Sequence, residues 1–413
     1  MRFSLRQARF SEKRSTFVEI LIKIFAMKIV HTSDWHLGHT LYNYDRTEEQ
    51  QAMLLQLTDL VREEQPDLFL LCGDVYHTPQ PSAAVQTLFT NALMALHEAC
   101  PGMTIVATAG NHDSSTKHEI FSTPWRSLKV HTIGCIDVTR KEVLIVELPG
   151  RGYVIAVPYV NERNMPKGLL QELLDAVSER NKEQLPVILS AHTTVRGCDF
   201  TGHAQATERT VGGIDAYALE EMGSGYDYLA LGHIHHAQFV HGGEHRVRYS
   251  GTPLPVSFDE CYPHTVTVVE LGAHGDIPSV REVAIHNPHP LVTLPADGVA
   301  TWEEAKVMLG AFPDDLEVYI RLNVEVDDFL PAEAQGEAHQ LVEGKKCRFC
   351  VIQTHRLHLS PREAKVMSVQ EFKTEAPIDI AMRYAQDIGV TFDDDLKELF
   401  CQTLEAVREE DRR

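Results

Sequence analysis

The sequence has no apolar run long enough to cross a membrane and no dense set of cysteines. A membrane-spanning helix needs about 18–20 consecutive apolar residues, so neither a membrane segment nor a membrane partner is expected. The eight cysteines are scattered over the chain, which excludes the disulfide framework of a small secreted domain and favours a reducing compartment, the cytoplasm. Cys347 and Cys350 form a CxxC pair, but no second pair stands nearby to complete a structural zinc site. We therefore interpret them as two thiols on a strand.

Positive charge is also scarce, because 38 lysines and arginines face 59 aspartates and glutamates and give a net charge of −21. Proteins that bind nucleic acid are usually basic, so the overall charge opposes such a partner. Bound metal cations, or a local basic patch, could still hold a phosphate group, because bound ions are often the largest charges in a site. The 413 residues, 43% of them hydrophobic, suffice for two or three domains with apolar cores.

The first 26 residues differ from the rest, since they carry six basic and two acidic side chains. Their one apolar stretch is interrupted by charges and lacks a cleavage site, so it does not have the pattern of a signal peptide. Three interpretations of this basic N-terminal extension stay open. Translation begins at Met27 and the extension is not made, or it is a flexible, disordered arm, or it is a targeting peptide.

Five short apolar runs recur along the next part of the chain, and each ends in polar residues. Runs of this length, rich in Val, Ile, Leu and Phe, predict buried strands. The runs are residues 27–34, 67–74, 103–113, 185–192 and 226–235, and their polar residues are Asp34, His36, Asp74, Asn111, His112, Asp113, His192, His233 and His235. Helical stretches separate the runs, so an α/β fold is expected. Ligand sites in α/β folds gather at the carboxyl ends of strands, and the five polar ends therefore predict one assembled site.

Two amphipathic stretches predict helices over 47–65 and 82–99. Thr47 is the expected N-cap of the first, and Gln50 three residues later would complete a capping box. Glu48 and Glu49 add negative charge to the first turn, where the helix dipole favours it. Ser82 is the expected N-cap of the second helix.

The pattern changes after residue 285. Residues 286–298 contain several prolines and a glycine, as a linker does, and are followed by a helix (301–310), a strand (316–326), a helix (331–343) and a strand (347–357). A small α+β capping domain over 286–360 is expected. The tail, 361–413, is expected to be helical. Two amphipathic helices are predicted over 368–409, divided near Gly389, and they dock on a partner or pack on this chain.

The polar strand ends together offer two carboxylates, an amide oxygen and several imidazoles. This mixture suits Mn²⁺, Fe or Zn²⁺ better than Mg²⁺ alone. Two such ions about 3.5–4 Å apart clamp a phosphoryl group, and a shared carboxylate is their natural bridge. Gly73 and Gly110 precede Asp74 and Asn111, where a flexible backbone lets the chain turn sharply. A single His or Asp at a strand end is usually a cap or turn residue. The five clusters in this order, DxH, GD, GNHD, H and GHxH, in contrast rarely arise together by chance.

That order of motifs resembles the calcineurin-like metallophosphoesterases. The stretches TSDWHLGHTLY (32–42) and YSGTPLPVSFDE (249–260) are similar to the SbcD branch of nuclease subunits and its counterparts in double-strand break repair. The resemblance covers about 27–270 and implies a two-sheet β-sandwich core flanked by helices, with a nuclease domain over 27–285. It implies one metal on Asp34, His36, Asp74 and His235, and a second on Asp74, Asn111, His192 and His233, with Mn²⁺ the expected ion. His112 would protonate the leaving oxygen or stabilise charge at phosphorus.

The same resemblance implies a metal-dependent DNA nuclease subunit, a double-strand exonuclease and single-strand endonuclease that acts in DNA repair, recombination and replication. The chain has no Walker A motif, so an SbcC-like coiled-coil ATPase would supply any ATP chemistry to a nuclease homodimer within a heterotetramer. Phosphatase relatives carry GDxxDRG, whereas this chain has His77 and no such arginine. His77 or Asp113 would orient His112, or His77 is an ordinary turn residue. The alternatives are a phosphatase or small-molecule phosphodiesterase of the same superfamily, and a scaffold without activity.

Overall fold

The computed structural model describes residues 26–161, 164–202, 216–243, 245–327 and 329–356, with isolated positions further on. The chain divides into two compact units, Met1–His355 and Arg356–Arg413. The predictions for the basic extension and for the helical tail fall almost wholly outside the described residues, and they stay predictions. Among the described residues, none of the helices combines the length and the apolar character that a membrane span requires.

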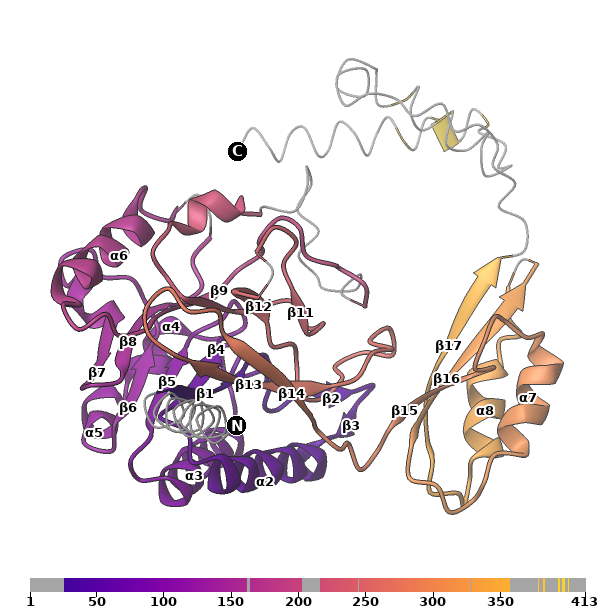
Figure 1. Cartoon of the computed structure of the whole chain (residues 1–413). Helices are drawn as coiled ribbons and strands as arrows, with labels where there is room; N and C mark the ends of the chain where they lie inside the picture. Colours follow the sequence, from indigo (N-terminus) through magenta and orange to yellow (C-terminus); the bar gives the residue numbers. More distant parts are fainter. Residues whose placement is uncertain are drawn as a thin grey trace, which may run out of the picture. The chain divides into compact units, whose positions relative to one another are not determined.

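Two six-stranded sheets form the core of the first unit (Figure 1). The first sheet has the order β14 (Ser279–Ala284), β13 (Thr265–Leu271), β1 (Met27–Thr32), β4 (Leu68–Cys72), β5 (Thr104–Thr108) and β6 (Val130–Ile133). The second has the order β11 (Gln238–Phe239), β12 (Val247–Tyr249), β10 (Tyr228–Gly232), β9 (Val187–His192), β8 (Gly152–Val157) and β7 (Ile145–Leu148). All five predicted strands are present, and each lies inside a sheet rather than at its edge.

Alternating side chains of the central strands build two apolar cores. In β4, Leu68, Leu70 and Cys72 belong to the cluster between the sheets, whereas Phe69 and Leu71 belong to the cluster beneath the helices. This alternation follows from the period of two in a strand. Helices α2 (Thr47–Glu64) and α3 (Ala83–Ala99) lie side by side on the outer face of the first sheet, and α6 (Leu169–Arg180) lies beside the second (Figure 1). The predicted two-sheet β-sandwich flanked by helices is confirmed.

The two predicted helix starts had different outcomes. The hydroxyl of Ser82 accepts a hydrogen bond from the Val85 amide at 3.3 Å, so this cap is confirmed. The cap at Thr47 was wrong, because Thr47 is already helical and its amide donates to the Asp45 carboxylate at 2.9 Å. Gln50 forms no capping box. It is buried, and it accepts from the Gly38 amide at 3.0 Å and donates to the carbonyl of His36. Gln50 therefore bonds to the loop after β1, and not to the start of its own helix as predicted.

A three-stranded sheet, β15 (Leu291–Leu294), β16 (Tyr319–Val326) and β17 (Arg348–Arg356), follows the sandwich. Helices α7 (Trp302–Gly310) and α8 (Ala334–Leu341) share an apolar core with it (Figure 1). The interpretation of 286–298 as linker alone was wrong, since β15 lies within it and pairs in parallel with β16. Cys347 and Cys350 are buried in two different apolar clusters, as thiols on and beside a strand.

Candidate active site

The five polar strand ends meet at one edge of the sandwich. Strands β1, β4 and β5 are parallel neighbours in the first sheet, and β9 and β10 are parallel neighbours in the second. Their carboxyl ends therefore point the same way within each sheet, and the loops that follow them converge. The structure brings the seven predicted metal-binding side chains together in two overlapping groups.

In the first group, the Nε2 atoms of His36 and His235 lie 3.2 Å apart. The Nε2 atom of His36 is 3.7 Å from Oδ2 of Asp74, and that of His235 is 4.0 Å from Oδ1 of Asp34. The donor atoms of Asp34, His36 and His235 lie within 4.8 Å of one another, where each could donate a lone pair to the same cation.

In the second group, Nε2 of His192 lies 3.5 Å from Oδ2 of Asp74 and 2.9 Å from Oδ1 of Asn111. The same Asn111 oxygen is 3.1 Å from Nδ1 of His233. The Oδ2 atom of Asp74 therefore belongs to both groups. Among the described residues, three sets of donor atoms lie within 4.8 Å of one another and could hold a metal ion: those of Asp34, His36 and His235, those of Asp34, Asp74 and His192, and those of His36, His77 and His112.

The backbone at these positions is strained. Asp34, His36, Asp74 and His233 have φ angles of 54°, 44°, 49° and 94°, in the left-handed region that non-glycine residues rarely adopt. Such residues cost about 1–3 kcal/mol each and persist where the surrounding structure enforces them. Here the Asp34 amide donates to the Gly73 carbonyl and the His36 amide to the Asp74 carbonyl, both at 3.0 Å. The loops after β1 and β4 are thereby fixed to each other.

Two glycines leave the space that the side chains of Asp74 and His192 occupy. A Cβ atom on Gly110 would lie 2.1 Å from Oδ1 of Asp74, and one on Gly73 would lie 2.1 Å from Nδ1 of His192. Gly73 also has a positive φ of 84°. Any larger residue would push Asp74 or His192 aside, so the predicted need for glycine has a steric cause at both positions and also a conformational one at Gly73.

Several buried groups of the site have shifted pKa values. Burial raises the pKa of Asp74, but His192 and His36 outweigh this and hold the pKa well below its ordinary value. Burial lowers the pKa of His192, but the neighbouring Asp74 carboxylate raises it to about 9. Burial likewise lowers the pKa of His235, and Glu260 raises it to about 9. The low pKa of Asp74 thus reflects the positive charge that this carboxylate attracts, which divalent ions would supply in place of protons.

Two further groups orient the imidazoles. Nδ1 of His235 is 2.9 Å from Oε1 of the buried Glu260, and Nδ1 of His192 donates to the Cys72 carbonyl at 2.8 Å. Each ring therefore presents Nε2 to the site, in the arrangement by which a carboxylate or carbonyl fixes a metal-binding histidine. Sequence reasoning missed Glu260, although it ends the 249–260 motif. An acidic residue that closes such an apolar stretch was the available signal.

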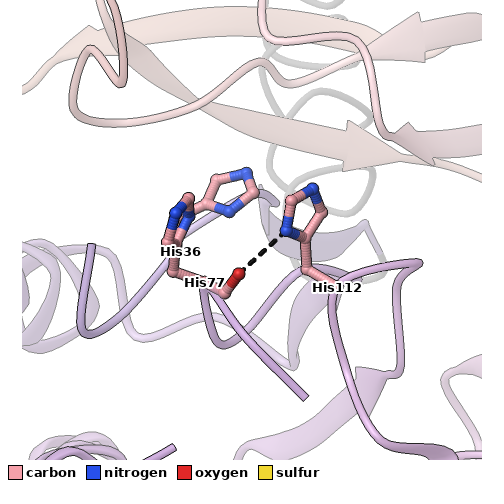
Figure 2. Close-up of side chains that lie close together, drawn as sticks. All are labelled: His36, His77 and His112. Atoms are coloured by element: carbon pink, nitrogen blue, oxygen red, sulfur yellow. Dashed lines mark hydrogen bonds between the residues drawn. The ribbon is translucent and has the colours of Figure 1, made fainter. Parts of the chain in front are cut away.

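His112, His77 and Asp113 complete the site. The His112 amide donates to Oδ1 of Asp74 at 2.9 Å, and its Nδ1 donates to the main-chain carbonyl of His77 at 2.9 Å (Figure 2). The His77 and His112 rings stack with centroids 5.6 Å apart. The Asp113 carboxylate instead accepts from the amides of Gly110, Val75 and Tyr76, which ties two loops together. In the structure, the carbonyl of residue 77 orients His112.

Comparison with known proteins agrees with this geometry. The model of the calcineurin-like phosphoesterase family matches residues 27–237. The SbcD subunit of the nuclease SbcCD from Rhodobacter capsulatus is 33% identical over 317 residues, 70% of this chain and 77% of the relative. The SbcD subunits from Escherichia coli K12 and Bacillus subtilis are 27% and 28% identical over 92% and 94% of this chain and 98% and 100% of their own lengths. The chain therefore belongs to the calcineurin-like phosphoesterase family and, within it, to the branch of SbcD subunits.

Proposed function

We propose that this chain is a metal-dependent DNA nuclease that hydrolyses phosphodiester bonds with two divalent ions, most suitably Mn²⁺. The observation that carries the proposal is the position of Asp74, whose Oδ2 lies 3.7 Å from Nε2 of His36 and 3.5 Å from Nε2 of His192. We assign Asp34, His36, Asp74 and His235 to one ion, and Asp74, Asn111, His192 and His233 to the other. The Asp74 carboxylate would then serve both ions.

The donor set fits this assignment. Carboxylate, amide and imidazole ligands together suit Mn²⁺, Fe or Zn²⁺. When bound, the metal pair would supply Lewis acidity and positive charge for the attack of water on phosphorus. Nδ1–H of His112 donates a hydrogen bond to the His77 carbonyl and keeps its proton, which leaves Nε2 as the atom that can carry a second proton. We assign Nε2 of His112 to protonation of the leaving sugar oxygen, or to stabilisation of charge at phosphorus.

The relatives' shared name, the SbcD subunit of a nuclease SbcCD, supports DNA as the substrate and an SbcC-like ATPase as the partner. We propose double-strand exonuclease and single-strand endonuclease activity in DNA repair, recombination and replication, by a nuclease homodimer within a heterotetramer in the cytoplasm.

The tail beyond residue 360 is the proposed docking element for the ATPase. A chain ending near residue 360 should keep its metals and lose the partner in co-purification, whereas a chain lacking residues 1–26 should still digest DNA.

A phosphatase would use the same metal ligands, so substrate choice must be measured. The decisive experiment is digestion of end-labelled duplex DNA by the purified chain with Mn²⁺ or EDTA, with and without the ATPase, alongside a phosphomonoester. Metal-dependent shortening of DNA supports the proposal, and hydrolysis of the monoester alone contradicts it.

The bridging role of Asp74 has its own control. Asp74→Ala should abolish activity and lower the occupancy of both ions in elemental analysis, because both lose a ligand. Asp59→Ala removes an exposed aspartate of α2 and should change neither. Two ions per chain in Asp74→Ala would rule out the bridge.

A further inference from the structure

We propose that Arg46 and Glu49 form a buried positioning pair that aligns His112 for proton transfer and connects it to the three-stranded sheet. This inference rests on the proposed function of His112. Neither residue touches the donor atoms of the metal site, and both are almost completely buried at the start of α2. Their contacts extend in two directions, one towards the small sheet and one towards the site.

Towards the sheet, the Glu49 carboxylate is held by residues that follow the sandwich in sequence. Its Oε1 accepts from the Tyr319 hydroxyl at 2.6 Å and lies 3.1 Å from Nδ1 of His289. Arg348 reinforces this end, since its Nη1 donates to the same hydroxyl at 2.6 Å. The other carboxylate oxygen, Oε2 of Glu49, accepts from Nε of Arg46 at 2.5 Å. Glu49 therefore sets the orientation of the guanidinium from the side of the small sheet.

Towards the site, Nη1 of Arg46 reaches two different segments. It donates to the Pro255 carbonyl at 2.5 Å, in the stretch that ends at Glu260, and it lies 3.2 Å from Nδ1 of His39. His39 follows His36 in the loop after β1. A buried ion pair by itself is weak support for any role. A positioning role is indicated because the two acceptors of Nη1, His39 and Pro255, lie in segments that also carry active-site side chains.

A series of imidazole rings in contact connects Arg46 to His112. The His39 ring lies 4.5 Å from the His77 ring in an edge-on contact, and the His77 ring lies 5.6 Å from the His112 ring at 25°. The His36 ring also lies 5.6 Å from that of His77 (Figure 2). Because these rings are packed against one another, a shift of Arg46 would be transmitted to His77 and then to His112.

The test uses two conservative variants. Glu49→Gln keeps the size and removes the charge that holds Arg46, and Tyr319→Phe removes one hydroxyl at the sheet end. Because misplacement of a reacting group by about 1 Å can cost roughly 100-fold, we expect kcat on a dinucleotide to fall roughly 10-fold for Glu49→Gln, and less for Tyr319→Phe. KM and the two ions per chain, measured by elemental analysis, should stay unchanged. Tyr44→Phe is the matched control, since its hydroxyl donates to the Phe349 carbonyl and does not contact Glu49.

Two readouts separate positioning from a general loss of structure. The decrease should shrink on bis(p-nitrophenyl) phosphate, whose leaving group needs no proton. Glu49→Gln combined with His112→Gln should be no slower than His112→Gln alone, because both changes remove the same contribution. Equal losses on both substrates, additive losses in the double variant, or wild-type kcat in Glu49→Gln would each overturn the inference. Failure of the wild-type chain to cleave any phosphodiester would instead contradict the proposed function.

Discussion

The Nδ1 atom of His112 lies 2.9 Å from the main-chain carbonyl oxygen of His77. A carbonyl can only accept, so it fixes the proton on Nδ1 and leaves Nε2 free to exchange one. The residue at position 77, where phosphatase relatives carry an aspartate, thus acts on His112 through its backbone. Two predictions separate the contributions of the two side chains.

Replacing His112 by Gln should slow hydrolysis of DNA by about 10²–10⁴, as loss of a general acid does. Metal content and DNA affinity should stay close to normal, because each proposed ion keeps four protein ligands. Single-turnover rates on DNA and on a nitrophenyl phosphodiester, together with elemental analysis, measure this. A variant that loses an ion would show that His112 is a ligand. An equal loss on both substrates would favour stabilisation of charge at phosphorus.

Replacing His77 by Ala should cost far less than replacing His112, about 10-fold against the 10²–10⁴ of a proton-transfer group. The carbonyl that orients His112 stays in place, and only the stacked ring is lost. The comparison is made as kcat of both variants on one oligonucleotide. If His77→Ala is as slow as His112→Gln, the imidazole of His77 takes part in the chemistry itself.

Replacing Gly110 by Ala should remove metal binding, because the added Cβ would lie 2.1 Å from Oδ1 and 2.2 Å from the amide nitrogen of Asp74. The matched control is Gly102→Ala near the start of β5, where an added Cβ meets no atom within 4 Å. Titration with Mn²⁺ in a calorimeter checks both. Normal affinity in Gly110→Ala would mean that Asp74 can move away without loss, and that it does not bridge two ions.

Replacing Glu260 by Ala should weaken metal binding roughly 10–100-fold, the usual effect of losing a carboxylate that orients a metal-binding histidine. Only the ion assigned to His235 should be affected, and Glu260→Gln should lose less because an amide oxygen can still accept from Nδ1. Glu270→Gln, an exposed site on β13, serves as the control. Equal weakening of both ions would point to a general disturbance of the loop rather than to His235.

His31 makes the fold sensitive to acid. It is fully buried in β1, and burial, with help from Arg248, lowers its pKa to about 3, whereas an unfolded histidine titrates near 6.5. The unfolded chain therefore binds a proton that the folded chain does not, and stability is lost as the pH falls from about 6.5 towards 3. At pH 5.5 the cost is about 1.4 kcal/mol. In EDTA, the melting temperature of His31→Gln should fall less steeply between pH 7 and 5.5. Parallel curves for the two proteins would contradict this.

The sequence by itself determined the strands that carry the site and the order of their polar ends. Short runs such as 67–74 are apolar on both faces, because both faces of β4 are covered in the fold. An apolar run without polar alternation predicts a strand that is buried on both faces, even when the segments that cover it are not known. The glycines before Asp74 and Asn111 could also be predicted from the sequence, but for different reasons. Gly73 has a positive φ that glycine favours, whereas at Gly110 an added Cβ atom would meet Asp74.

Only the tertiary structure decided which donor atoms meet. His36 and His235 are far apart in sequence, yet their Nε2 atoms lie 3.2 Å apart because the two sheets face each other. No local pattern fixes that pairing. The same holds for the side chains of Gln50 and Glu49, which suit a helix N-terminus but bond instead to the His36 loop and to Tyr319. A buried polar group must take whatever partner the packed fold offers, since leaving it unpaired costs more than losing a local cap.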